Sequence, residues 1–234
     1  MSKIMLTVDD NPQIVTRSVV DYLMENKIPA VLFIEGARAE KDRDSVLYAI
    51  RNGFIIGNHS YSHPFFSKLT YDECVEEIEK TEAIIEDIYK EAGVKRPVKL
   101  FRFPFIDKGY DRSEEHKRKL QEYLGAHGFS KLDCSGIKAP GYFSNGWDKD
   151  VDITFSYDCM EYMVRPGEMT FSQIMDRLRN GDEEMGSNVL TDKSTNLILI
   201  HSHDETEMME KDYFKKIVGE MIKSGVEFVE TKFT

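Results

Sequence analysis

Short apolar segments alternate with longer amphipathic segments along the whole 234-residue chain. Segments such as Lys3–Val8, Pro29–Ile34 and Leu197–Ile200 have the length and composition of buried strands. The segments between them carry apolar residues at helical spacing, and one of these, from Thr70 to about Ala92, begins with the capping-box pair Thr70 and Glu73. Strands separated by helices throughout a chain indicate parallel β-α-β units. We therefore predict an α/β fold.

The pattern shows no linker, repeat or low-complexity block, which predicts a single domain over residues 1–234. Periodicity does not distinguish a closed barrel from an open sheet. Polar residues at the strand ends favour a barrel, of about seven parallel strands, because barrel enzymes gather their chemistry at the carboxyl ends of the strands. Residues 135–150 and 180–195 are expected to form surface loops. The aromatic residues of the first loop, Tyr142, Phe143 and Trp147, either stack on a ligand or, as we favour, pack the loop down.

Several element boundaries follow from local signals. Asn11 is expected to cap a helix with Pro12 at its first position and Ile14 on its buried face. Further segments are expected to be strands at Val98–Phe101, Asp152–Tyr157 and Val226–Val229, and one helix at Glu207–Ser224.

Composition limits the possible partners and compartments. The net charge of −11 disfavours nucleic acid and anionic membranes, which bind basic surfaces. Three separated cysteines without a CxxC pair predict no disulfide framework. No stretch has the length of a membrane span, and Met1 leads directly into an apolar strand without a signal peptide. A cytoplasmic location is therefore expected, or an exported one if a signal has been removed.

A polar segment between residues 56 and 64 contains His59 and His63. If it forms a helical turn, both imidazoles project from one side and can bind one divalent ion; otherwise they are ordinary polar residues in a loop. Asp9 and Asp10 directly follow the first strand, either as metal-site carboxylates or as a capping residue beside a solvated one. One aspartate and two histidines would leave a fourth position open, as in catalytic zinc sites.

Two further polar residues stand at strand ends. Arg102 is flanked by aromatic residues, so it needs an anionic partner, such as a carboxylate near the metal, unless it simply covers aromatic faces at the surface. His201 ends a fully apolar strand and is either a hydrogen-bonded structural residue or a general acid. His203 and Asp204 follow at once, so His203 competes for the same role.

Four motifs carry a resemblance to a known family. In order and approximate spacing, the chain resembles the polysaccharide deacetylase (NodB-homology) family, carbohydrate esterase family 4, at Thr7–Pro12, His59–Pro64, Arg102–Phe105 and Leu199–His201. The resemblance implies a distorted (β/α) barrel and hydrolysis of an N-acetyl group from an amino sugar. It also implies a bound divalent metal, for which zinc is the first expectation.

The resemblance also implies roles for individual residues. Asp10, His59 and His63 correspond to the metal ligands, Asp9 to the general base, His201 to the general acid and Arg102 to the residue that orients the base. The Phe105 backbone N–H corresponds to the oxyanion donor. Asp158, in the segment Asp158–Tyr162, is expected to pair with His201 or Arg102 and to hold the imidazole charged.

The chain departs from the family pattern at a few positions. Asn11 replaces the usual Gly, Val8 the common Phe and Phe105 the usual Tyr. In the segment Asp158–Tyr162, which resembles a further family motif, Glu161 and Tyr162 stand for Asp and Trp. Two alternative functions stay open. One is hydrolysis of another C–N bond, in a small formamide or cyclic imide. The other is a catalytically silent sugar- or metal-binding module, which the joint presence of all the motif residues disfavours.

Overall fold

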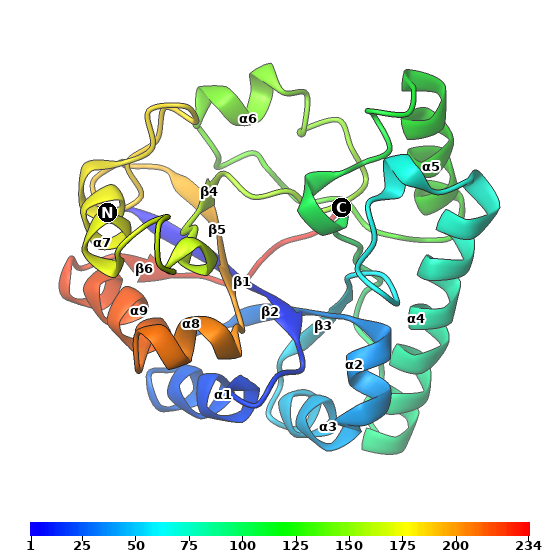
Figure 1. The fold of residues 1–234 in the computed structure, drawn as a ribbon, viewed down its shortest axis with the longest axis horizontal. Helices are drawn as coiled ribbons and strands as arrows, with labels where there is room; N and C mark the ends of the chain where they lie inside the picture. Colours follow the sequence, from blue (N-terminus) through cyan, green and yellow to red (C-terminus); the bar gives the residue numbers. More distant parts are fainter.

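A computed structural model describes all residues, 1–234, and contains one parallel β-sheet surrounded by helices (Figure 1). The neighbouring strands follow the order β3-β2-β1-β5-β4, and β6 pairs with the start of β1. The strand bounds are β1 Lys3–Asn11, β2 Ala30–Ile34, β3 Ile55–Asn58, β4 Tyr157–Asp158, β5 Thr195–His201 and β6 Glu227–Phe228. All the pairings are parallel, which confirms the predicted α/β class.

The connecting helices cover the outside of this sheet. Their bounds are α1 Thr16–Glu25, α2 Gly36–Lys41, α3 Arg43–Arg51, α4 Tyr71–Ala92, α5 Glu114–Ala126, α6 Pro140–Ser144, α7 Phe171–Asn180, α8 Asp204–Met209 and α9 Tyr213–Lys223. Helix α4 confirms its predicted bounds: Thr70 and Glu73 form the capping box, and Gly93 ends the helix at φ 70°. That backbone angle favours glycine because it has no Cβ.

The sheet is open rather than closed into a barrel of about seven strands. Two segments that were expected to be strands make only scattered backbone contacts. Phe101 forms an isolated bridge with Asn58 and accepts a hydrogen bond from the Ile153 N–H at 2.8 Å. Within the segment expected as a strand at 152–157, only Tyr157 joins the sheet, as the first residue of β4. These two segments extend the sheet toward a barrel at this edge, but no regular strand pairing closes it.

The start of the first helix was predicted wrongly. Asn11 belongs to β1, its peptide bond to Pro12 is cis, and α1 begins only at Thr16. The Asn11 side chain donates to the Val8 carbonyl oxygen at 2.8 Å, so it satisfies its own strand instead of capping a helix. Ile14 is 88% exposed rather than buried. The predicted helix at 207–224 is likewise two helices, α8 and α9.

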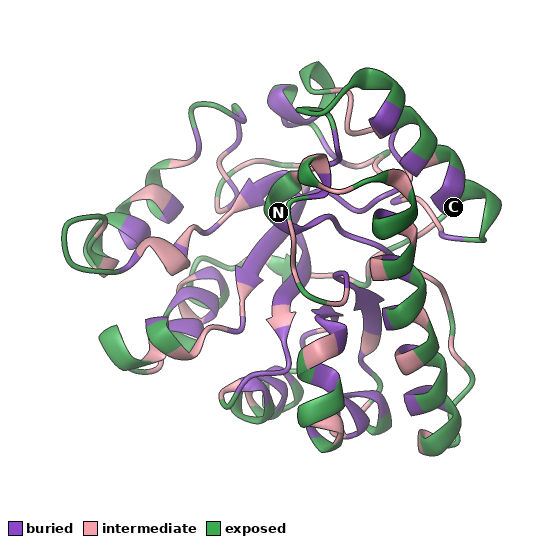
Figure 2. Cartoon of the chain, turned by 45° about the vertical axis from the view of Figure 1, so that its right-hand side comes forward, coloured by how far each residue is buried: buried purple, intermediate pink, exposed green.

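The core lies on both faces of the sheet, where the strands are buried and the helices turn exposed faces outward (Figure 2). Its largest cluster contains 34 buried residues and joins β1, β2 and β5 to α1, α3 and α9. Within the loop at 135–150, Tyr142 is buried and Trp147 packs beside it, which confirms the packing interpretation for these two residues. No helix is long and apolar enough to cross a membrane.

Replacing Leu32 with alanine should lower the free energy of unfolding by about 2–5 kcal/mol, because it leaves a cavity in a close-packed strand. Leu32 is 1% exposed in the middle of β2. Urea denaturation followed by circular dichroism measures the loss. Met208→Ala is the control: Met208 is 84% exposed, and its loss should change stability by less than about 0.5 kcal/mol. Equal effects of the two substitutions would contradict this account of the core.

Candidate active site

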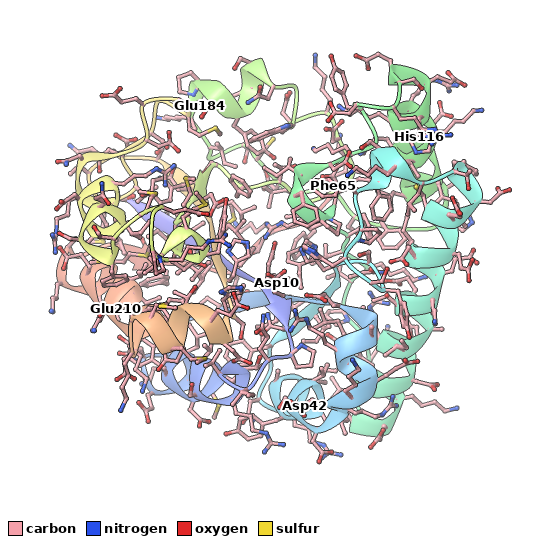
Figure 3. All side chains as sticks on the ribbon, in the orientation of Figure 1. Asp10, Asp42, Phe65, His116, Glu184 and Glu210 are labelled. Carbon is pink, nitrogen blue, oxygen red and sulfur yellow. The ribbon has the colours of Figure 1, made fainter.

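The predicted site residues meet at the carboxyl ends of three strands. Asp9 and Asp10 lie at the end of β1, His59 directly follows β3, and His201 ends β5 in register with Asp9. In Figure 3, Asp10 lies near the middle of the face, where these strand ends converge. A cavity of about 510 Å³ opens here. It is lined by Asp9, Asp10, Glu35, Arg38, His59, Ser62, His63, Arg102, Phe103, Phe105, Ile106, Phe155, Asp158, Tyr162, Arg165, Leu199, His201, His203 and Glu205.

Asp10, His59 and His63 converge on one point. The Asp10 Oδ1 atom lies 3.5 Å from His59 Nε2 and 3.4 Å from His63 Nε2. Two ligands about 2.0–2.1 Å from a tetrahedral ion are separated by roughly 3.3 Å, so these spacings suit a shared zinc-sized cation. The buried Asp10 Oδ1 also accepts no hydrogen bond within the chain. The three side chains therefore fit a divalent metal.

The protonation states of His59 and Asp10 also suit metal binding. Burial lowers the pKa of His59, which favours the neutral imidazole that metals bind. Its Nδ1 lies 2.8 Å from the Arg102 carbonyl oxygen. That oxygen only accepts hydrogen bonds, so the proton sits on Nδ1 and the Nε2 lone pair faces Asp10. Burial opposes ionisation of Asp10, but His63, His201 and His59 hold its pKa well below the ordinary value.

The segment from His59 to His63 is an irregular loop, so the helical turn considered for it does not form, yet both imidazoles still face Asp10. Ser60 and His63 both adopt positive φ angles, 66° and 58°. The Glu77 carboxylate on α4 accepts the N–H groups of Tyr61 at 2.9 Å and Ser62 at 2.7 Å. The second imidazole therefore reaches Asp10 through a loop that α4 holds in place.

Asp9 has a different environment from Asp10. It is 2% exposed, and its Oδ1 accepts a hydrogen bond from Arg102 Nη1 at 2.7 Å. The Arg102 guanidinium also donates to Thr7 Oγ1 and to the Ile153 carbonyl oxygen, each at 2.8 Å, and lies over the Phe33 ring. The expectation that Arg102 pairs with a carboxylate is confirmed. This pairing fixes the orientation of the Asp9 carboxylate.

His201 pairs with Glu161 rather than with the expected Asp158. Glu161 Oε1 lies 2.9 Å from His201 Nδ1 and accepts the His201 backbone N–H at 2.6 Å. Burial alone would lower the pKa of His201, but the Glu161 carboxylate raises it to about 10. The imidazole is therefore protonated at neutral pH and can donate a proton. Glu161, three residues after Asp158, was available in the sequence as the second acid of the same motif.

Asp158 and His203 take supporting positions. Asp158 Oδ1 accepts the Met160 N–H at 2.8 Å, and burial raises its pKa to about 6. It lies in one cluster with Glu161 and His201 without bonding the imidazole. Arg102, its other expected partner, bonds Asp9 instead. His203 Nδ1 accepts the Thr206 N–H at 3.3 Å and caps α8, so it does not compete with His201.

Phe105 lines the cavity beside His63, and the centroids of the two rings are 4.5 Å apart. The φ angle of Phe105 is 57°, which is unusual for a residue with a side chain, and its N–H makes no hydrogen bond within the chain. Asp10 adopts a similar φ angle of 61°. Backbone strain of this kind gathers at functional sites, where the surrounding structure holds it. A free N–H on a residue that lines the cavity is available to act as an oxyanion donor.

Comparison with known proteins agrees with these motifs. The family model described as "Polysaccharide deacetylase" matches residues 1–129, more than half of the chain. The chain belongs to the polysaccharide deacetylase family. A peptidoglycan-N-acetylglucosamine deacetylase from Bacillus cereus is 38% identical over 85 residues, which are 36% of this chain and 31% of that relative's length.

Solved structures of this family share the fold. The peptidoglycan deacetylase PdaC from Bacillus subtilis superposes with a TM-score of 0.63 at 23% identity, over 98% of this chain and 87% of that chain. A mutant of a family 4 carbohydrate esterase pseudoenzyme superposes with the same TM-score at 14% identity, over 97% of this chain and 64% of that one. Since active and inactive proteins have this fold, the side chains of the cavity must carry the functional argument.

Proposed function

We propose that this protein is a metal-dependent hydrolase that removes an N-acetyl group from an amino sugar in a poly- or oligosaccharide. One observation carries the proposal. A three-residue metal-ligand set, an arginine-held carboxylate and a carboxylate-held imidazolium all face a single cavity. Amide hydrolysis requires an activated water, a base for its proton and an acid for the leaving nitrogen.

The metal would be held by Asp10, His59 and His63, and the mixed carboxylate and imidazole donors favour Zn²⁺. When bound, it would polarise the acetamide carbonyl group and lower the pKa of a water molecule. In this arrangement Asp9 removes the proton from the attacking water, and the hydrogen bond from Arg102 holds the Asp9 carboxylate in position.

The remaining groups act on the carbonyl oxygen and on the leaving nitrogen of the substrate. The Phe105 N–H donates to the carbonyl oxygen as negative charge develops on it. His201 transfers a proton to the leaving nitrogen, since an amine anion is a very poor leaving group. Glu161 supports the charge on His201 before this transfer. Residues of this chain therefore supply all the proposed catalytic groups.

The test is acetate release from N-acetylglucosamine oligomers by the purified protein. Turnover should fall at least about a hundredfold after chelation and return when Zn²⁺ is added, because the Lewis acid and the activated water are lost together. A formamide and a cyclic imide are assayed in parallel. Turnover of the imide alone would assign the site to a different C–N bond. Sugar binding without turnover in metal-replete protein would make the chain a silent binding module.

A further inference from the structure

The loop that carries the Phe105 N–H has a strained backbone. Phe105 and Ile106 both adopt positive φ angles, 57° and 56°, which residues with side chains rarely adopt. The N–H groups of Ile106 and Asp107 donate within the loop, whereas the Phe105 N–H makes no hydrogen bond within the chain. Backbone strain of this kind persists only where the surrounding structure holds it. Side-chain contacts of the loop must therefore keep the Phe105 N–H in place.

Lys108, further along the same loop, is a buried lysine with a full set of partners. The residue is only 4% exposed. Its ammonium group donates to Asp150 Oδ2 at 2.7 Å and to Thr154 Oγ1 at 2.8 Å, and it lies 3.1 Å from Asp152 Oδ2. A buried charge is tolerated only when it is paired and hydrogen-bonded, and these three oxygens meet that requirement. The side chain therefore ties the loop to residues 150–154.

The segment 150–154 is itself held at two points. In its middle, the Ile153 carbonyl oxygen accepts a hydrogen bond from Arg102 Nε at 2.8 Å. Gln121 of α5 donates to Asp152 Oδ1 at 2.7 Å, so a helix also holds one of the carboxylates that face the ammonium group. The segment therefore gives the buried ammonium group a fixed support, and this support is bonded to the arginine of the site.

We propose that Lys108 is a positioning residue that anchors the loop carrying the Phe105 N–H to the segment that holds Arg102. The inference rests on the proposed function, in which this N–H donates to the oxyanion. Oxyanion donors are effective because they are already in place when the charge develops. Lys108 does not line the cavity, so it acts through the backbone of Phe105 rather than on the substrate.

The same loop has a second polar anchor. Asp107 Oδ2 accepts hydrogen bonds from the Ser67 N–H at 2.9 Å and from the Ser67 hydroxyl at 2.7 Å. Because these bonds remain when the Lys108 anchor is lost, the loop should loosen without unfolding. The effect on kcat should therefore not exceed the loss of one oxyanion donor, which costs about 10²–10³.

Lys108→Met removes the ammonium group and keeps most of the aliphatic stem. With N-acetylglucosamine oligomers, kcat should fall about ten- to a hundredfold while KM and metal content stay unchanged. With N-trifluoroacetyl analogues, kcat should fall by less than about threefold, because the fluorine atoms withdraw charge from the oxyanion and reduce its need for a donor. A protein that is only less stable would lose turnover of both substrates equally. The matched control is Lys117→Met: Lys117 lies on α5, 3.2 Å from Asp150 Oδ1, and should change neither rate.

Nuclear magnetic resonance relaxation of ¹⁵N-phenylalanine-labelled protein tests the anchor without turnover. The order parameter of the Phe105 amide should be about 0.85 in the unsubstituted protein and in Lys117→Met, and below about 0.6 in Lys108→Met. Thr154→Val removes one hydrogen bond from the ammonium group and no charge. If Lys108→Met does not fold, Thr154→Val decides by the same two measurements, with a lower order parameter and a loss of acetyl turnover of about two- to fivefold.

The two measurements separate this inference from the proposed function. If the unsubstituted protein turns over no acetylated sugar but Lys108→Met loosens the Phe105 amide, the anchor stands and the proposed reaction falls. If acetylated oligomers are turned over and Lys108→Met changes neither the order parameter nor the ratio of the two substrates, the anchor is wrong and the reaction stands. Equal losses for both substrates, or an equal effect of Lys117→Met, would also overturn the positioning role of Lys108.

Discussion

Asp10→Ala should abolish both metal binding and acetate release, whereas Asp9→Asn should keep the metal and lose only the turnover. Asp10 Oδ1 lies 3.5 Å from His59 Nε2 and 3.4 Å from His63 Nε2, so its removal leaves only the two imidazoles as proposed ligands. We expect metal affinity to fall by more than about a hundredfold, since even outer groups that orient ligands contribute about 10–100-fold. Asp9 bonds Arg102 instead, and loss of a general base costs about 10²–10⁴ in kcat.

The measurements are metal content by mass spectrometry and steady-state acetate release. Asp111→Asn serves as the control, because Asp111 is an exposed carboxylate outside the cavity and should change neither quantity. Removing one partner of a buried ion pair costs about 3–5 kcal/mol, so thermal unfolding must show that the Asp9→Asn protein is folded at the assay temperature. An Asp10→Ala protein that keeps its metal and full turnover would disprove the assigned ligand set.

The second large effect concerns the pair formed by His201 and Glu161. His201→Ala should lower kcat by about 10²–10⁴, the usual contribution of a general acid. Glu161→Gln should keep more activity and change its pH dependence. The Glu161 carboxylate raises the pKa of His201 to about 10, so the acid is protonated below that pH and loses its proton as pH rises through it. Without the carboxylate the pKa falls, and the alkaline limb of kcat/KM moves to lower pH.

Asp158→Asn provides the comparison for this experiment. Asp158 lies in the same cluster and also raises the pKa of His201, but it makes no hydrogen bond to the imidazole. Its substitution should shift the alkaline limb less than Glu161→Gln does. Identical shifts would mean that charge alone supports His201 and that the hydrogen bond is unimportant. An unchanged limb in the Glu161→Gln protein would remove His201 from the role of acid.

The sequence was informative wherever local chemistry determines structure. The α/β class followed from apolar periodicity, and α4 followed from its capping box and terminal glycine. Asp9, Asp10 and His201 could be placed together because parallel strands bring their carboxyl ends to one edge. These features depend on spacing along the chain, which a single sequence displays directly.

Features set by contacts between distant segments were not predictable in the same way. The partner of His201 depends on a turn at Met160, where φ is 58°, and this turn brings Glu161 rather than Asp158 against the imidazole. The loop from His59 to His63 is held by a hydrogen bond to Glu77 on α4. Its conformation therefore could not be predicted from its own residues. The open edge of the sheet arises because Phe101 meets its neighbours through isolated bonds.

Arg102 has a consequence for how tolerant this site is to change. Its carbonyl oxygen sets the tautomer of His59 while its guanidinium holds Asp9, so a proposed metal ligand and the proposed base are both anchored to one residue. A shift of its backbone by a fraction of an ångström would misalign both groups at once. Because both groups depend on Arg102, substitutions that move its backbone should abolish activity rather than reduce it gradually.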